Sequence, residues 1–553
     1  MRSTFPIPVQ IAAALFAAAL PAPSHAAQDV LDRTDPAVLG KAMRGEDPVD
    51  PTSTQPLIAE QSARSPQSGT ETLLVGAIRV EGSVALPPSA FAPVIEIYVG
   101  RTLTPADLSA LASAVANSAR AAGYGLATAW IPRQRVVNGI LRITLDEGRI
   151  DSVRVEGSAG PVVARMLNPL ANGRPVRTAE LERRLLLAGD IAGMWVGKAR
   201  LERADGRNIL VVDTKRDRVA GRVALDNWGI SSVGPVRLQG NVDVHGVAGS
   251  GDRLTLGAVA TVPDVEEFHL VRAAYSVPIG NDGTELRLDS YLARSEPGGA
   301  IADRDLDGRS LEAALAVSHP FVRSRAWSLW GDLGFALRDS RQSRDDVRIR
   351  DDRFATLTAS AFANAKLGDG RVRGRIAFVQ GVDAFDATER GDPLASRPDG
   401  SAIFSKVEAW GRLNAPLSQK ISLQIEAQGQ IASRPLLSSE EMGLGGRTFL
   451  RGYDYRELSG DKGVAGSAEL RFDLGKLGNA VRWVQPYLYA DAGSVGNYQG
   501  GGGGGSLAST GGGVRLWLGS RFEAGVELGV PLRDGAFGRD CDPRLSLTFG
   551  ARL

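Results

Sequence analysis

Apolar and polar residues alternate through the second part of the chain, from residue 218 to the end. In the segment RFEAGVELGVPLR (521–533) every second residue is apolar: Phe522, Ala524, Val526, Leu528, Val530 and Leu532. Segments 467–474 and 544–553 show the same pattern. Because successive side chains of a strand point to opposite faces, each segment predicts a β-strand with one apolar face. About sixteen such segments occur, most of them longer than the ordinary globular strand of about 5 to 6 residues.

The connections between these segments alternate in length. Five are short turns: 246–251, 279–284, 366–371, 475–480 and 519–520. Four others are long polar stretches that we expect to be loops: 338–352, 382–401, 433–465 and 494–511. Outer-membrane barrels have an even number of long strands, short turns at the periplasmic end and long loops at the outer end. The pattern therefore favours a sixteen-stranded transmembrane β-barrel over 218–553 rather than a secreted β-sandwich.

A repeat precedes the barrel segments. GAIRVEGS at 76–83 returns as DSVRVEGS at 151–158, and each copy is followed by helical patterns and then by two strand patterns. In the first copy Thr104 and Asp107 can form a capping box around Pro105, which predicts a helix start. The second copy has the same order of elements. We therefore predict two β-α-α-β-β modules of an α+β type, at 73–149 and 150–217.

The first 72 residues predict a leader followed by a small helical unit. Arg2, the apolar run from Val9 to Leu20 and the small residues before Ala27 are typical of a signal peptide over 1–26. In 27–72, the Asp35-Pro36 pair can start a helix that Gly45 can end. The remainder is rich in Pro, Ser, Thr and Gln and predicts a linker. We expect the helix from Asp35 to Arg44 to act as a plug in the resting lumen.

Composition removes several function classes. The chain has 64 basic and 63 acidic side chains and a net charge of +1, so nothing favours nucleic acid as a partner. The single cysteine, Cys541, and four histidines predict neither a disulfide nor a metal site. The glycine run 500–505 lies between strands with no helix after it, which argues against nucleotide binding. We find no catalytic constellation and expect no cofactor and no enzyme activity.

One of the long loops carries a recognisable motif. Its centre is Leu450-Arg451-Gly452-Tyr453, preceded by GLGG, followed by GDKG and then by a strand that begins GSAEL. The first module contains Pro132 and Gln134 as a PxQ element, and LDNWGISSVG opens the barrel region. Together these resemble the two-partner secretion transporters of the outer-membrane assembly superfamily. Leu450, where Val or Ile is usual, and the terminal Leu553, where Phe is common, depart from the family pattern.

The resemblance implies an architecture and a site. The two modules would be POTRA domains, and the loop that carries Arg451 would fold back into the barrel lumen. In this family the motif arginine pairs with an aspartate in a strand motif that matches YADAG, which corresponds to Asp491. Alternation independently predicts that Asp491 faces inward. A guanidinium can hold one carboxylate through two hydrogen bonds, so this pair would tether the loop inside the pore.

The function that the resemblance implies is export. We expect a pore in the Gram-negative outer membrane that captures an unfolded exoprotein in the periplasm and translocates it without ATP. Its client-binding residues would lie within 73–217, and its client would be an adhesin, a haemolysin or a contact-dependent toxin. Outer-membrane lipids, periplasmic chaperones and the barrel assembly machinery would be its other partners. An assembly factor of the same superfamily is the alternative; it would ordinarily carry more POTRA repeats, and a passive porin would not need 73–217.

Overall fold

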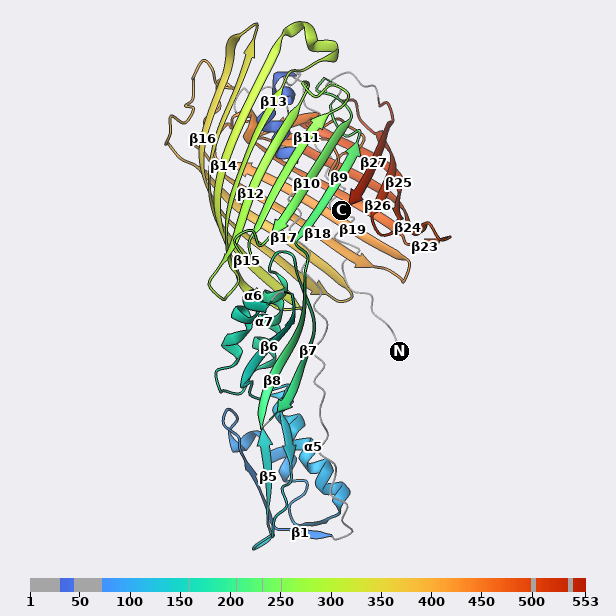
Figure 1. Cartoon of the computed structure of the whole chain (residues 1–553). Coiled ribbons are helices and arrows are strands. Elements are labelled where there is room, and N and C mark those ends of the chain that lie inside the picture. The colour runs from blue at the N-terminus through green and yellow to red at the C-terminus, as the bar shows by residue number, and fades with distance from the viewer. Residues whose placement is uncertain are drawn as a thin grey trace.

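The computed structural model describes residues 30–43 and 72–553, apart from 159, 205, 231, 250, 499–503 and 536–540. The predicted signal peptide and most of the predicted linker lie outside these residues. Figure 1 shows three parts in line: a large barrel, one small module directly beneath it, and a second module farthest from it. Among the described residues, no helix has the length and apolar character needed to cross a bilayer.

The first module has the predicted order of elements. A three-stranded sheet has the order β2-β5-β4, with β2 parallel to β5, and a short β1–β3 ribbon lies beside it. Helix α5 begins with the predicted capping box, in which Thr104 and Asp107 bond reciprocally and Pro105 is the first helical residue. The elements are β1 (Leu73–Val75), β2 (Ala77–Glu81), η1 (Pro88–Ala90), α4 (Ala92–Ile95), β3 (Arg101–Leu103), α5 (Pro105–Ala121), β4 (Thr128–Trp130) and β5 (Ile140–Asp146).

The second module repeats this arrangement. Its sheet has the order β6-β8-β7, and β6 is parallel to β8, as β2 is to β5. The elements are β6 (Ser152–Gly157), α6 (Gly160–Leu167), η2 (Asn168–Leu170), α7 (Thr178–Gly189), β7 (Met194–Ala204) and β8 (Arg207–Arg216). The prediction of two β-α-α-β-β modules is confirmed.

The structure explains why VEGS occurs twice. Gly82 and Gly157 follow the first strand of each module with φ values of 89° and 101°. A Cβ atom would lie 2.4 Å from the Leu145 carbonyl oxygen at Gly82 and 1.9 Å from that of Thr214 at Gly157. Only glycine tolerates both the positive φ and this close approach to the neighbouring strand.

The two modules contact each other closely. Leu126 of the first module is buried in the apolar core of the second. The Thr178 backbone N–H donates to the Gly123 carbonyl at 2.9 Å, and the Gly125 N–H donates to the Thr178 hydroxyl at 2.9 Å. These contacts join the modules into one arm.

The second module is also attached to the barrel. Arg323, the last residue of β14 (Leu306–Arg323), donates two hydrogen bonds of 2.7 Å to the two carboxylate oxygens of Asp190. Arg184 of α7 donates to the carbonyl of Asn281 at 2.8 Å, in the turn between β12 (His269–Ile279) and β13 (Thr284–Ser295). The arm therefore meets the barrel at its short-turn end.

Sixteen long antiparallel strands and the short β23 close the barrel, with β27 pairing with β9. The barrel elements are β9 (Val219–Asp226), β10 (Arg237–His245), β11 (Arg253–Thr261), β12 (His269–Ile279), β13 (Thr284–Ser295), η3 (Gly299–Arg304), β14 (Leu306–Arg323), β15 (Trp327–Arg344), β16 (Val347–Leu367), β17 (Gly370–Gly381), β18 (Ser405–Pro416), β19 (Ile421–Ala432), β22 (Lys462–Phe472), β23 (Gly475–Leu477), β24 (Val481–Gly496), β25 (Gly505–Leu518), β26 (Phe522–Pro531) and β27 (Arg544–Arg552). The predicted sixteen-stranded barrel is confirmed.

Two of the four predicted long loops are wrong in extent. Residues 338–352 form the ends of β15 and β16, joined by a tight turn in which Asp345 and Asp346 have φ values of 48° and 62°. Similarly, β24 and β25 extend through most of 494–511. Strand ends beyond the membrane have no lipid-facing side, so they lack the apolar alternation from which a strand is recognised.

The barrel has its apolar face outside. Leu528, Leu547 and Phe549, predicted on the apolar faces of their strands, are each 47% exposed. The inner face carries polar and charged side chains, including Glu469, Asp491 and Glu527, which are all buried by the lumen contents.

Candidate functional site

The connection between β19 and β22, which we call the lumen loop (residues 433–461), folds into the barrel. It contains η4 (Ser438–Glu440) and a small hairpin of β20 (Met442–Leu444) and β21 (Leu458–Gly460). Its apolar side chains pack on inward residues of the barrel wall in one buried cluster: Met442, Leu444, Phe449, Leu450, Tyr453, Leu458, Ala465, Val495 and Leu507. Apolar burial therefore holds the loop against the wall on which β22, β24 and β25 lie.

The structure brings Arg451 and Asp491 together. The Arg451 Nε and Nη2 atoms donate to the two Asp491 carboxylate oxygens at 3.1 Å each, and the Arg451 backbone N–H donates to the same carboxylate at 3.1 Å. The two side chains are 6% and 0% exposed. This is the bidentate geometry that an arginine fork makes with one carboxylate.

Arg451 has further partners that sequence reasoning missed. Its Nη1 lies 2.7 Å from Glu469 and 3.4 Å from Glu527, and its Nη2 donates to the Ser467 hydroxyl at 3.0 Å. Its guanidinium also lies 3.4 Å from the centre of the Tyr489 ring. Burial opposes its charge, but the bonds and charges of Asp491, Glu527 and Glu469 outweigh burial and raise the pKa of Arg451.

The other three motif residues fit the loop tip to the wall. A Cβ at Gly452 would lie 2.9 Å from the Pro531 backbone nitrogen, so any larger residue would push the tip off β26. The Tyr453 hydroxyl donates to the Arg533 carbonyl at 2.7 Å and lies 2.9 Å from the Ala508 carbonyl. Leu450 is fully buried with a positive φ of 60°.

Inward-facing glycines of β25 and β26 make room for this arrangement. A Cβ at Gly511 would lie 2.6 Å from the Tyr489 hydroxyl, and one at Gly513 would lie 2.6 Å from the Tyr487 hydroxyl. At Gly529 a Cβ would lie 2.9 Å from the Arg451 carbonyl oxygen. Glycine inside a strand often marks such a close approach, so these residues had a signal in the sequence.

Helices α2 (Val30–Thr34) and α3 (Pro36–Met43) lie inside the far half of the barrel (Figure 1). The second begins at Pro36, where the Asp35-Pro36 pair predicts a helix start, and Asp35 accepts a hydrogen bond of 2.8 Å from the Ala37 N–H. Ser340 of β15 donates to Asp35 at 2.8 Å, and Arg350 of β16 donates to Asp32 at 2.8 Å. Burial raises the pKa of Asp35, although the hydrogen bonds that it accepts from Ser340 and Ala37 act in the opposite direction.

The helices also contact the lumen loop. Arg33 lies 3.4 Å from Asp454 and 3.8 Å from Glu457, and the Tyr455 hydroxyl donates to the Val38 carbonyl at 3.3 Å. The helices and the loop thus fill the lumen as neighbours.

A cavity of about 260 Å³ adjoins Arg451 on the wall formed by β25, β26, β27 and β9. Charged residues of both signs line it, among them Arg222, Arg447, Glu523 and Glu527. In the part of the chain that the structure describes, no group of three or more His, Cys, Asp or Glu residues is placed to hold a metal ion. Part of the lumen beside Arg451 is therefore an open space with charged side chains of both signs on its wall.

A closed barrel with an apolar outer face, a polar lumen and an arm of small modules at the short-turn end defines an outer-membrane transporter, with the arm in the periplasm. Residues 205–516 match the family model described as haemolysin secretion/activation protein ShlB/FhaC/HecB, and residues 73–148 match the ShlB-type POTRA domain. The first match covers more than half of the chain, which therefore belongs to this family of two-partner secretion transporters that translocate exoproteins.

Named relatives agree with this assignment. The heme/hemopexin transporter protein HuxB of Haemophilus influenzae is 24% identical over 460 residues, which cover 80% of each chain. The outer membrane transporter CdiB of Escherichia coli is 24% identical over 437 residues, covering 74% of this chain and 71% of its own.

Solved structures share the fold. CdiB from Escherichia coli superimposes with a TM-score of 0.73 at 20% identity, over 96% of this chain and 100% of its own. BamA from Haemophilus ducreyi lacking POTRA domains 1–3 gives 0.53 at 13% identity, over 88% of this chain and all of its own. The family match and the named relatives support secretion better than the assembly-factor alternative.

Proposed function

We propose that this transporter is closed at rest by two elements in the lumen, helices α2–α3 and the lumen loop, and that the arm delivers an unfolded exoprotein to it. The observation that carries the proposal is the contact of Arg451 with Asp491, because this buried ion pair ties the tip of the lumen loop to an inward residue of the barrel wall. The α2–α3 helices fill space beside it through hydrogen bonds and ion pairs.

We propose that capture uses the edge strands of the two sheets of the arm. In the first module β2 and β4 are the edge strands, and in the second β6 and β7 are. Edge strands present unpaired N–H and C=O groups to which an extended segment can add, with little dependence on its sequence. Helix α6 packs beside β6 and turns its apolar residues, such as Val163 and Met166, into the core of the module.

Transport would be driven by folding of the client outside the cell. Burial of apolar surface in the folded exoprotein is favourable and happens only after exit, so the chain is drawn outward without ATP and without a catalytic step. The client that we propose is one large exoprotein of the adhesin, haemolysin or contact-dependent toxin class. Lipids would cover the apolar outer face, and periplasmic chaperones with the barrel assembly machinery would insert the barrel.

Deletion of residues 73–149 tests capture. We expect secretion of the cognate exoprotein to be lost while the barrel stays folded, which its heat-modifiable mobility on gels would report. The deletion also removes Leu126 from the core of the second module, so Leu126→Ala in the full chain is the matched control. Normal secretion by the deletion variant would remove capture by the first module from the mechanism.

Deletion of residues 27–46 tests the plug. We expect higher single-channel conductance in planar bilayers, because the deletion removes the helices that occupy the far half of the lumen. Unchanged conductance would show that α2–α3 do not close the pore.

A further inference from the structure

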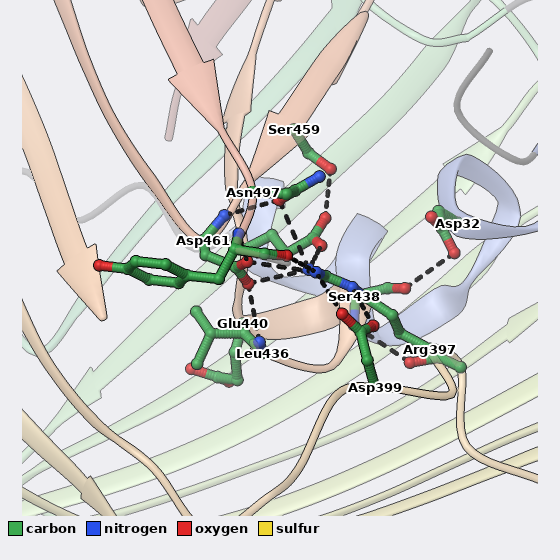
Figure 2. Close-up of polar contacts among 12 residues, drawn as sticks. Asp32, Arg397, Asp399, Leu436, Ser438, Glu440, Ser459, Asp461 and Asn497 are labelled. Carbon is green, nitrogen blue, oxygen red and sulfur yellow. Dashed lines mark hydrogen bonds and ion pairs between the residues drawn. The ribbon is translucent and has the colours of Figure 1, made fainter. Parts of the chain in front are cut away.

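Another of the buried arginines lies at the long-loop end of the barrel, away from the motif. Arg397 belongs to the connection 382–404 between β17 and β18, and it is 8% exposed. Figure 2 shows its guanidinium at the centre of a cluster of polar side chains. It donates to Asp399 at 2.8 Å within its own loop, and to Glu441 at 2.7 Å and Asp461 at 2.8 Å in the lumen loop region.

The third connection in this cluster is the one between β24 and β25. Arg397 Nη1 lies 3.4 Å from the Asn497 side-chain oxygen, which also accepts from the Asp461 N–H at 3.0 Å. Asp461 is fully buried and accepts from the backbone N–H groups of Leu436 at 2.7 Å and Tyr498 at 2.8 Å. Arg397 and Asp461 therefore join the connection 382–404, the lumen loop and the two residues that follow β24, Asn497 and Tyr498.

Ser438 connects the cluster around Arg397 to helix α2. Ser438 of the lumen loop donates through its hydroxyl to Asp32 at 2.8 Å, and its N–H donates to the hydroxyl of Ser396 at 3.1 Å (Figure 2 shows the first contact). Ser396 directly precedes Arg397. Arg456, which donates to the Ser438 carbonyl at 2.8 Å, also donates to the Glu441 carbonyl at 3.2 Å.

The chemistry of the cluster suits a closure that must open. A buried ion pair contributes little net stability relative to its solvated state, because desolvation offsets much of the attraction. Opening to water therefore costs less than separating an apolar interface of the same size. Loss of one partner is different, because it leaves a buried charge without compensation.

We propose that Arg397 is a positioning residue for export: it holds the connection 382–404, the lumen loop and the first residues after β24 together beside the resting plug, and its release is coupled to departure of α2–α3. It is distinct from Arg451, which seats the loop tip on the wall of β24. The inference rests on the proposed plug. Two variants, Arg397→Ala and the deletion of residues 27–46, distinguish failure of the inference about Arg397 from failure of the plug.

The test measures the open probability of single channels in planar bilayers for Arg397→Ala in the full chain. Coupling between two sites in a protein changes an equilibrium by roughly 5- to 150-fold, and we expect an increase in this range. Arg390→Ala is the matched control, because Arg390 is an exposed arginine of the same connection. We expect the control to behave as the wild type.

The double variant identifies the coupling. In the chain that lacks residues 27–46, Arg397→Ala should add little, because the closed state that it stabilises is already lost. If the two effects multiply instead, Arg397 closes the mouth without reference to the plug and the coupling is wrong. If deletion of 27–46 raises conductance but Arg397→Ala leaves the open probability unchanged, the plug stands and the inference about Arg397 fails.

A folding defect is covered by two milder variants. Arg397→Lys keeps the charge but loses the fork, and Asn497→Ala removes one partner only. Both should insert as heat-modifiable barrels and show smaller increases in open probability than Arg397→Ala. Wild-type open probability in both variants would overturn the proposal. In that case a change in the melting of the barrel alone would mean that Arg397 only stabilises the fold.

Discussion

Among the arginines that each face three carboxylates, Arg200 lies on the periplasmic arm and Arg451 lies in the barrel lumen. Arg200 of β7 contacts Glu156 at 2.7 Å, Asp213 at 2.8 Å and Glu202 at 3.1 Å. Arg451 contacts Glu469, Asp491 and Glu527 at 2.7, 3.1 and 3.4 Å. The distances alone do not distinguish them.

Exposure separates the two clusters. The Arg200 side chain is 30% exposed and its partners are 39% to 44% exposed, whereas no member of the Arg451 cluster exceeds 9%. Water and salt compete for exposed ion pairs, so their removal changes little. A buried carboxylate that loses its partner has no such replacement. An arginine with three carboxylates therefore contributes little on the exposed arm, whereas the same combination around Arg451 holds the lumen loop in place because it is buried.

Arg451→Ala is expected to have the largest effect. Removing one partner of a buried pair costs about 3 to 5 kcal/mol, and the burial of both side chains places this site in that class. The variant should insert as a folded barrel, because the lipid-facing strands lose nothing, yet secrete poorly. Secretion assays together with heat-modifiable mobility check both parts.

Asp491→Ala provides the control for the pairing itself. It should reproduce the Arg451→Ala defect, and the double variant should be little worse than either, since partners in one interaction are not additive. The charge exchange Arg451→Asp with Asp491→Arg is expected to rescue secretion only in part. The exchanged side chains start from different backbone positions, so they cannot meet with the same geometry. Defects that multiply in the double variant would mean that the two residues act independently.

The pair could be predicted from the sequence, but its surroundings could not. Alternation places Asp491, Glu469 and Glu527 on inner faces of their strands. It does not say which inward residues meet, because that depends on how far the lumen loop reaches across the barrel. The resemblance supplied one partner, Asp491, and the remaining two required the folded loop.

The two loops that the sequence predicts too long have a similar explanation. The alternation that reveals a strand comes from lipid on one side and the lumen on the other. At Asp345 and Asp346 the hairpin has left the lipid, so its polar sequence resembles a loop. Arg397 also lies beyond the lipid, and no motif in its connection marks it as a centre of contacts.

Asp190→Ala tests an intermediate level of burial. Its partner Arg323 is 1% exposed, while Asp190 itself is 31% exposed, so the pair lies between the two arginine clusters. Loss of the bidentate contact should loosen the arm at the barrel and lower secretion less than Arg451→Ala does. Distances between spin labels on the second module and the β12–β13 turn should broaden. An unchanged distance distribution would show that the other contacts of α7 suffice.

Glu147 shows how the arm holds a carboxylate without arginine. It accepts hydrogen bonds from Ser83, Val84, Ala85 and Leu86 at 2.8 to 2.9 Å. Burial opposes ionisation, but the bonds from the backbone N–H groups and the Ser83 hydroxyl outweigh it and lower the pKa of Glu147. Its stabilisation is therefore complete above the ordinary glutamate pKa of about 4.3 and is lost as the pH falls through the lower folded value.

Glu147→Gln should remove this pH dependence. The glutamine amide places an NH2 group opposite backbone N–H groups, where the wild type has a carboxylate oxygen that accepts from them. The first module should therefore unfold more readily at pH 7. It should also lose less of its stability on acidification than the wild type. Thermal unfolding of the full chain between pH 3 and pH 7, monitored at the first module, measures the difference. Equal acid sensitivity in both proteins would assign the effect to another carboxylate.

Arg200→Ala is expected to have the smallest effect, and it completes the comparison. Three carboxylates, Glu156, Glu202 and Asp213, would lose their common partner, so counting ion pairs alone predicts a defect as large as that of Arg451→Ala. Because all three are reached by water, solvation replaces the lost contacts, and mutual repulsion is screened at physiological ionic strength. Secretion and the melting of the arm should both match the wild type, with a small decrease in stability appearing only at low salt, where screening is weak. A secretion defect at physiological salt would show that Arg200 contacts the client or the barrel during transport, and exposure would then no longer separate the two clusters.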